Sequence, residues 1–176
     1  MPRPADEKRT LLATALCAAA LVAVLYALLG VWPFGGGSVL TGDLNGQYIN
    51  YNASFARALR AGGDGFFYSF EKHMGGSLLG ILAYYCASPF NLLYLLCDVS
   101  HYAQMAGVVL AAKLVCMCTA MAFFLGRHTP SLRHRAVLPA LCWGFCAYAV
   151  VYAQNVMWLD VLILLPLICW GIDVLW

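Results

Sequence analysis

Charged residues are scarce in this chain. Of its 176 residues only 10% are Asp, Glu, Lys or Arg, whereas 63% are hydrophobic, and the mean hydropathy is +0.78. Soluble domains carry roughly 25% charged residues, so this chain cannot cover its apolar surface with polar groups. Lipid must be its solvent, and the lipid bilayer is the first partner that the sequence predicts.

Two further features that the chain lacks exclude other classes of protein. The net charge is only +2, and no basic stripe with interleaved aromatic residues is present, so we expect no nucleic-acid partner. Eight cysteines occur, but most lie inside apolar runs and none forms a metal-type CxxC pair. We interpret them as small buried hydrophobic residues, and we expect neither a disulfide framework nor a protein-bound metal site.

Long apolar runs are what the chain has instead. Residues 11–32 form an unbroken run that is longer than the core of a signal peptide, and no small-residue cleavage site follows it. We expect this run to be a membrane-spanning helix, with the N-terminus of the chain in the cytoplasm. Three more runs are long enough to be spans, at residues 102–125, 136–153 and 159–176.

The arginine-rich segment between the second and third expected spans orients the chain. It contains three arginines and no acid, so the positive-inside rule places it in the cytoplasm. Because the first helix exits outside, an odd number of crossings must precede this segment. The ambiguous apolar stretch at residues 77–97 is therefore not a span.

The composition of residues 77–97 agrees with this conclusion. Ser88-Pro89 and Asn91 interrupt the stretch at its middle, which predicts two short helices in or near the outer interface. The sequence thus predicts an all-α polytopic membrane protein, cell-membrane located and multi-pass, with a large first outer loop at residues 33–101. The chain ends at Trp176 inside an apolar run, so we expect residues 1–176 to be the N-terminal part of one transmembrane domain.

The segment from Thr41 to Gly63 begins with a carboxylate and then turns amphipathic. Its apolar and aromatic side chains recur at spacings of three and four, at Leu44, Tyr48, Tyr51, Phe55 and Leu59. We expect an amphipathic helix that lies along the membrane plane near the lipid headgroups. Asp43 could cap the start of this helix, or it could keep an oxygen free for chemistry.

Three elements follow the first apolar run in a specific order: GDLNGQYINYNASFARAL, FYSFEKHMGGSLLGILAYYCASPFNLLYLL and NVMWLDVLILLPLICWGID. Together they closely resemble the start of the bacterial YfhO-type membrane proteins, which are large multi-spanning proteins of the GT-C glycosyltransferase class that use polyprenyl-phosphate-linked sugars. The resemblance covers nearly all of the chain. It implies a GT-C-like helical bundle, although such proteins have many more helices and a further outer portion.

The resemblance also implies an activity. The chain would transfer a sugar from a polyprenyl-phosphate-linked donor to an extracytoplasmic acceptor such as a cell-envelope polymer, and Asp43 matches the acidic residue that such enzymes use as catalytic base. A carboxylate within hydrogen-bond reach can take the proton that an attacking hydroxyl loses. The lipid-phosphate leaving group is stable as an anion, so no cofactor is required, although a divalent cation is compatible with the site.

Other residues are candidates for substrate binding on the expected outer face. Gln47 and Tyr48 complete the D-x-x-x-Q-Y element that begins at Asp43. Asn155 lies in the turn QNVMW and Asp160 follows that turn, which the topology places on the same side of the membrane as Asp43. Asp160 could bind the acceptor or a cation, or it could cap its own helix.

Two basic residues complete the set of candidates. Lys113 lies midway along an expected span, where a lysine is costly unless it faces a polar cavity or finds a partner. It could bind the donor phosphate, or it could pair with an acid on helices outside this chain. Arg57, on the amphipathic helix, could bind the donor phosphate or simply lipid headgroups.

A transporter or lipid-handling protein without covalent chemistry is the competing hypothesis. Transporters favour broken helices and polar residues near the middle of the membrane. Here the polar residues cluster mostly in the expected outer loop, and Lys113 is the main exception. This distribution favours an active site at the outer face.

Overall fold

The computed structural model describes residues 4–70, 72 and 74–176, and these residues form helices and connecting turns without a β-strand. This confirms the predicted all-α class. The chain forms two compact units, each described here by itself. Unit 1 comprises Met1–Gly37 and Leu110–Trp176, and unit 2 comprises Ser38–Val109.

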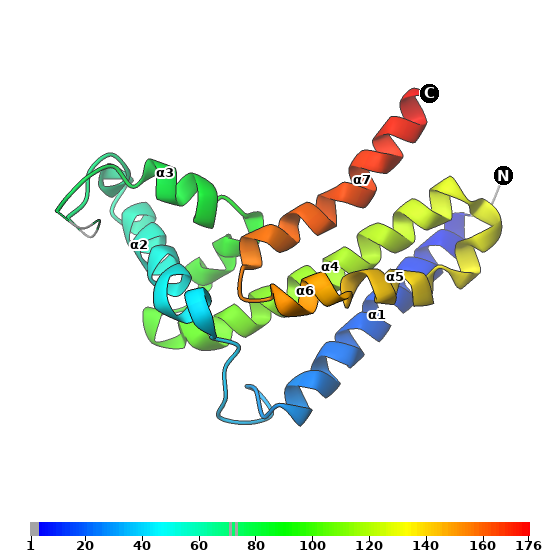
Figure 1. Cartoon of the computed structure of the whole chain (residues 1–176), viewed down its shortest axis with the longest axis horizontal. Helices are drawn as coiled ribbons and strands as arrows, with labels where there is room; N and C mark the ends of the chain where they lie inside the picture. The colour runs from blue at the N-terminus through cyan, green and yellow to red at the C-terminus, as the bar shows by residue number, and fades with distance from the viewer. Residues whose placement is uncertain (1–3, 71, 73) are drawn as a thin grey trace. The chain divides into compact units, whose positions relative to one another are not determined.

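Three helices of the described chain are long and apolar enough to cross a membrane. They are α1 (Pro4–Leu28), α4 (Tyr102–His128) and α7 (Leu159–Leu175), which are labelled in Figure 1. They coincide with three of the four expected spans. α1 ends four residues earlier than residue 32, because a turn with Gly30 at a positive φ of 63° follows it.

The fourth expected span, at residues 136–153, is not one continuous helix. It is divided into α5 (Val137–Gly144) and α6 (Ala147–Val151), because Cys146 between them has an extended backbone with φ −65° and ψ 161°. No proline marks this break, so hydropathy alone does not reveal it. A membrane crossing by residues 136–153 stays a prediction.

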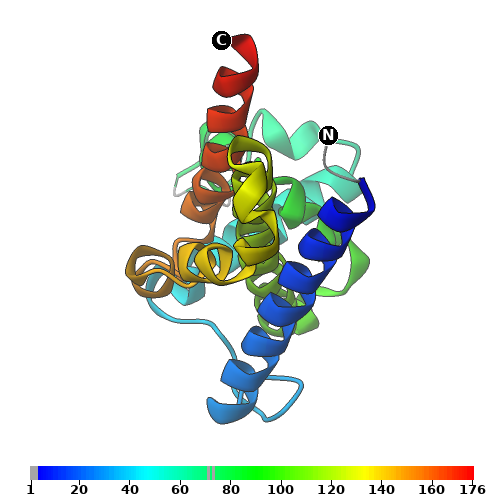
Figure 2. The ribbon, with the colours of Figure 1, turned by 90° about the vertical axis from the view of Figure 1, so that its right-hand side faces the viewer.

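α1 and α5 contact each other in unit 1 and can be followed in Figures 1 and 2, and each contains fully buried small residues. Thr14 and Ala18 of α1 are fully buried, as is Ala140 of α5. Small side chains let helix backbones approach closely, which is how helices associate in lipid. The Thr14 hydroxyl donates to the Thr10 carbonyl at 2.8 Å, so the α1 backbone satisfies it.

An ion pair and a hydrogen bond join three helix ends of unit 1. Arg127 at the end of α4 contacts Glu7 at the start of α1 at 2.9 Å, and His128 contacts Asp173 near the end of α7. The start of α1, the end of α4 and the end of α7 therefore lie at the same end of unit 1. The predicted topology requires these three points to share one side of the membrane, and the cytoplasmic assignment of that side stays a prediction.

Unit 2 contains two helical segments that pack against each other. The first runs from the π-helical turn η1 (Leu44–Tyr48) into α2 (Ile49–Arg60). The second runs from α3 (Leu79–Ile81) into the π-helical turn η3 (Leu82–Cys86) and then, after a 98° bend, into the 3-10 helix η4 (Pro89–Leu96). Short 3-10 turns complete the chain: η2 (Asp64–Phe66) and η5 (Val99–His101) in unit 2, and η6 (Pro130–Arg135) and η7 (Val156–Trp158) in unit 1.

The 98° bend lies where the sequence predicts an interruption of the apolar stretch at residues 77–97. Ser88 is extended, with φ −78° and ψ 134°, as expected for a residue before proline, and Pro89 then begins η4. The two predicted short helices are therefore present. Their location at a membrane interface stays a prediction.

α2 buries a face that is partly made of alanine. Ala53 and Ala56 pack into a core with Tyr94 of η4 and Tyr102 at the start of α4. Tyr48, from the predicted aromatic face, is also buried, whereas Leu59 is 38% exposed. The amphipathic pattern thus identifies the helix correctly, but it misses the small-residue side on which α2 packs.

Candidate functional site

Asp43 lies at the start of the first helical segment of unit 2, and its carboxylate does not cap that helix. Its backbone is already helical, with φ −68° and ψ −26°, and its side chain forms no capping hydrogen bond. One carboxylate oxygen, Oδ2, instead accepts a hydrogen bond from the Tyr48 hydroxyl at 3.3 Å. Asp43 is solvent-exposed, so its carboxylate remains accessible to a reactant.

The π-helical turn η1 explains why Asp43 meets Tyr48. In an α-helix the side chains that meet are three or four positions apart. A π-helix closes hydrogen bonds between residues five apart, and such turns are frequent at functional sites. Asp43 and Tyr48 are five positions apart and bracket η1, so the wider turn brings their side chains together.

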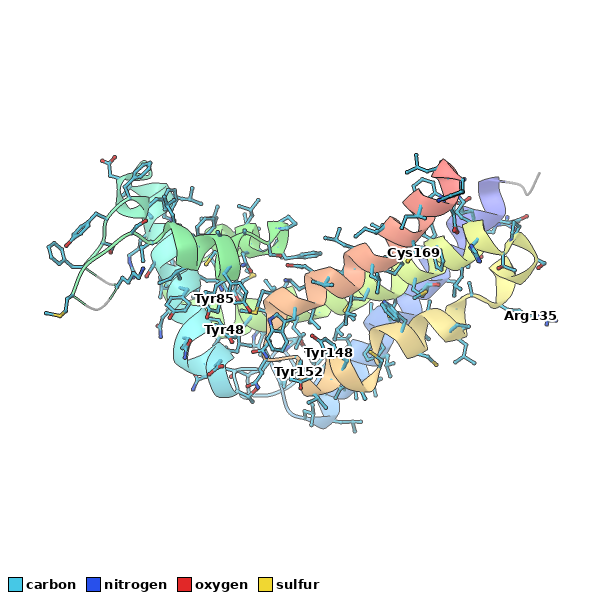
Figure 3. All side chains as sticks on the ribbon, turned by 45° about the horizontal axis from the view of Figure 1, so that its top comes forward. Tyr48, Tyr85, Arg135, Tyr148, Tyr152 and Cys169 are labelled. Atoms are coloured by element: carbon cyan, nitrogen blue, oxygen red, sulfur yellow. The ribbon has the colours of Figure 1, made fainter. Side chains whose placement is uncertain are left out.

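Tyr48 belongs to a cluster of four tyrosine rings that joins the two helical segments of unit 2. Tyr85 of η3 is its centre, with ring centroids 5.1 Å from Tyr48, 4.9 Å from Tyr51 and 4.7 Å from Tyr84. Figure 3 labels Tyr48 and Tyr85, which approach each other from neighbouring helices. This tyrosine cluster brings the D-x-x-x-Q-Y element against the YY…SPFN element.

The hydroxyl of Tyr48 is the hydrogen-bond donor to the Asp43 carboxylate. Burial of the ring, followed by the negative charge of Asp43, raises the pKa of Tyr48 to about 12. Burial likewise raises the pKa of Tyr85. The Tyr48 phenol is therefore protonated at neutral pH and donates its hydrogen to the carboxylate.

Two buried asparagines fix the backbone behind the tyrosine cluster. Asn52 Nδ2 donates to the carbonyl of Tyr48 and Asn91 Nδ2 donates to the carbonyl of Tyr85, each at 3.0 Å. Both asparagines are only 1% exposed. Tyr48 and Tyr85 are thus each held in two ways: by their ring contact and by a hydrogen bond to the main-chain carbonyl.

The remaining candidates of unit 2 have different surroundings. Gln47 is exposed on η1. Arg57 Nη2 donates to Ser54 Oγ at 3.3 Å, and both residues line a shallow hollow on α2. Arg60 instead donates to the carbonyls of Leu95 and Cys97 at 3.2 and 3.1 Å, so it stabilises the end of η4.

Lys113 and Asp160 form an ion pair in unit 1. Lys113 is completely buried in α4, and its Nζ lies 2.8 Å from Asp160 Oδ1 in the first turn of α7. The ammonium also donates to the carbonyl of Val156 at 2.8 Å. Asp160 is 23% exposed, so the pair is open on the carboxylate side, and Asn155 lies buried in the preceding turn.

Lys113 therefore finds its counter-charge within this chain. In the sequence Lys113 and Asp160 are separate candidates, and only the position of α7 beside α4 in the fold pairs them. Their predicted contact with substrate, and that of Asn155, stays a prediction.

The family model for the bacterial membrane protein YfhO matches residues 14–176. The chain belongs to the YfhO family. Comparison with curated proteins and with solved structures gives no match. The matched residues of this YfhO-family protein include Asp43, the tyrosine cluster and the Lys113–Asp160 pair.

Within the described residues of this YfhO-family protein, no group of three or more His, Cys, Asp or Glu side chains is arranged to hold a metal ion. Asp43 has the phenol of Tyr48 as its hydrogen-bond partner, and Asp160 has the ammonium of Lys113.

Sequence reasoning missed Asn52 and Asn91. The available signal was a polar amide within an apolar stretch, because a buried amide needs a hydrogen-bond partner. In the sequence Asn91 marks only an interruption of the apolar stretch, and Asn52 has no role of its own. Their backbone partners could not be known before the helices were placed.

Proposed function

We propose that this YfhO-family protein contributes the catalytic base of a membrane glycosyltransferase, which moves a sugar from a polyprenyl-phosphate-linked donor to an extracytoplasmic cell-envelope acceptor. The base is Asp43. The observation that carries the proposal is an exposed carboxylate at a helix start that does not cap the helix and has a neutral phenol as its partner. An exposed carboxylate within hydrogen-bond reach of a hydroxyl can take the proton that the hydroxyl loses.

The proposed reaction balances with these groups. The acceptor hydroxyl gives its proton to the Asp43 carboxylate while its oxygen forms a bond to the anomeric carbon of the sugar. The bond between that carbon and the phosphate oxygen breaks, and its electron pair leaves with the lipid phosphate. The Tyr48 hydroxyl holds one carboxylate oxygen, which leaves the other directed to the acceptor.

Exposed groups beside Asp43 are suited to contact the sugars. Gln47 offers an amide on the same turn, and Tyr84 is 56% exposed at the edge of the tyrosine cluster. An aromatic surface with a few polar groups is typical of small-molecule sites. Arg57 is the candidate of unit 2 for the donor phosphate, because a guanidinium binds phosphate oxygens in pairs.

The other three candidates contribute differently within this proposal. Lys113 is fully buried and neutralised by Asp160, so a direct contact with the donor phosphate requires the ion pair to open. Asp160 is the member of the pair that a ligand can reach, with Asn155 in the preceding turn. A cation that binds Asp160 would share its carboxylate with Lys113, whose ammonium contacts Oδ1.

A transporter or lipid-handling protein is the second candidate, and specific features favour it. The helix pair of unit 2 bends by 98°, the segment at residues 137–151 is divided, and Lys113 is a buried cation within an apolar helix. Discontinuous helices and intramembrane charges are typical of transporters.

A pair of aspartate substitutions in the full-length protein tests the proposal. We expect Asp43→Asn to lower sugar transfer to the envelope polymer by about 10²- to 10⁴-fold at normal abundance, because an amide cannot act as a base. Asp64→Asn is the matched control, since Asp64 is an exposed carboxylate of the same unit. Undiminished transfer by Asp43→Asn would remove Asp43 as the base, and loss of lipid flux without loss of transfer would support the transporter.

The side of the membrane is tested independently. In a cysteine-free background we expect Gly46→Cys, next to the proposed base, to react with an impermeant maleimide added to intact cells. Ser131→Cys, in the arginine-rich segment, is expected to react only after the membrane is permeabilised. The reverse pattern would contradict an extracytoplasmic site and a cytoplasmic N-terminus.

A further inference from the structure

The position of Asp43 in the backbone does not by itself fix the orientation of its carboxylate. An exposed aspartate side chain samples several rotamers, whereas a general base must hold its oxygen within hydrogen-bond reach of the reacting proton. The structure supplies one restraint, the 3.3 Å hydrogen bond from Tyr48 to Oδ2. How precisely the Asp43 carboxylate is oriented therefore depends on how firmly the Tyr48 side chain is held in place.

Tyr48 is held on every side that the structure describes. It is 7% exposed, and its ring packs against Tyr85 at 5.1 Å with an interplanar angle of 31°. Its carbonyl accepts the hydrogen bond from buried Asn52. A tyrosine has only two side-chain torsions, so ring packing fixes its hydroxyl at low entropic cost.

Tyr85 is in turn fixed by the bend that follows it. Asn91, in the first turn of η4 beyond Pro89, reaches back to the Tyr85 carbonyl at 3.0 Å. This bond closes the 98° bend between η3 and η4 and sets where the Tyr85 ring meets Tyr48. The contacts thus run in series from Asn91 through Tyr85 and Tyr48 to Asp43.

From this series we infer that Tyr48 is a positioning residue, which orients the Asp43 carboxylate for proton transfer and is itself set by Tyr85 and the bend at Asn91. The inference rests on the proposed role of Asp43 as the base. It assigns the YY…SPFN element a place in the reaction although that element contributes no reacting group. If the bend is distorted, Tyr85 and Tyr48 shift, and the Asp43 carboxylate is no longer aligned with the proton that it accepts.

Tyr48→Phe, with Tyr51→Phe as matched control, tests the inference in the full-length protein. Both changes keep a ring beside Tyr85, but only Tyr48→Phe removes the hydroxyl that contacts Asp43. With a radiolabelled polyprenyl-phosphate hexose as donor, we expect Tyr48→Phe to lower kcat about ten-fold with little change in KM. Tyr51→Phe leaves the contact between Tyr48 and Asp43 intact, so we expect a smaller loss of kcat than in Tyr48→Phe, and an equal loss in both variants would overturn the inference.

A chemical measurement tests the contact without using activity. Nitration by tetranitromethane requires the phenolate form of tyrosine, and the charge of Asp43 raises the pKa of Tyr48. We expect Asp43→Asn to lower that pKa and accelerate nitration of Tyr48, quantified by peptide mass spectrometry, while nitration of Tyr51 stays unchanged. This comparison leaves residue 48 intact, so it decides the contact even where Tyr48→Phe reduces abundance.

The outcomes separate this inference from the proposed function. An inactive Asp43→Asn variant combined with a wild-type kcat in Tyr48→Phe would overturn the positioning role alone. An active Asp43→Asn variant would overturn the catalytic role of Asp43, and the positioning role with it. Equal nitration of Tyr48 in wild type and Asp43→Asn would show that the two side chains do not interact in solution, which also overturns the positioning role.

Discussion

Asp43 in unit 2 and Asp160 in unit 1 are both aspartates in the first turn of a helix, but their partners differ in charge. Asp160 faces a buried ammonium at 2.8 Å, whereas Asp43 is exposed and accepts a hydrogen bond from a neutral phenol. Asp160 is thus suited to stabilise the packing of α7 on α4, and Asp43 to react.

The comparison shows that position at a helix start does not determine the role of an acid. The sequence places both aspartates beside apolar runs and offers a capping role for each. The structure assigns capping hydrogen bonds to neither side chain. The two aspartates differ in their partners: Asp160 pairs with charged Lys113 of another helix, and Asp43 with the neutral Tyr48 of its own turn.

The largest expected effect is on stability when the ion pair is broken. Asp160→Asn leaves Lys113 charged and buried without its counter-charge, and we expect a loss of about 3 kcal/mol of unfolding free energy. Asp43→Asn is expected to change stability by less than about 0.5 kcal/mol, because Asp43 is exposed. Thermal unfolding in detergent measures both, and equal losses would break the comparison.

A double substitution is the control that tests whether the broken ion pair causes the loss of stability. Lys113→Met with Asp160→Leu removes both charges and fills similar volume, so most of the lost stability should return. A double variant as unstable as Asp160→Asn would mean that the ion pair is not the source of the loss.

Glycine-to-alanine changes sharpen the contrast in packing between the units. At Gly144 of α5 a Cβ would meet Cys118 Sγ and lie 3.3 Å from the Leu114 carbonyl, so we expect Gly144→Ala to cost about 2 kcal/mol. At Gly46 of η1 a Cβ would meet no atom within 4 Å, and alanine should stabilise by about 0.5 kcal/mol. Opposite shifts in Tm are the expected result, and shifts of the same sign would contradict it.

The asparagine at the bend of unit 2 has a smaller expected effect. Asn91→Ala removes the bond to the Tyr85 carbonyl in a buried site, which should cost about 1–2 kcal/mol. Asn50→Ala is the control, because Asn50 makes a similar bond to the Gly46 carbonyl but is exposed. Hydrogen exchange of residues 82–96 should accelerate only in Asn91→Ala, and unchanged exchange would remove Asn91 from the series of contacts.

The smallest expected effects distinguish the two arginines of α2. Arg60→Ala removes two hydrogen bonds to the end of η4 and should cost about 1 kcal/mol, despite its exposure. Arg57→Ala should cost less stability than Arg60→Ala, because the bond from Arg57 to Ser54 joins residues of one helix whereas Arg60 links two segments. Urea unfolding of the two variants measures the difference, and a larger loss for Arg57→Ala would assign it a structural role.

The sequence by itself determined the features that depend on local composition. Three long apolar runs became α1, α4 and α7, and Ser88-Pro89 became the bend between η3 and η4. The segment after Asp43 became a helix with Tyr48 on its buried face. Hydropathy, proline and side-chain periodicity are properties of short stretches of sequence, so they can be evaluated without knowing the fold.

Only the tertiary structure decided which groups meet. Lys113 obtained a counter-charge from Asp160, and Tyr48 met Tyr85, through contacts between residues far apart in the chain. The break after α5 follows Gly144, but no proline or drop in hydropathy marks it. The energy of a buried charge or of a ring contact depends on the atoms that surround it, and the packing of the helices supplies those atoms.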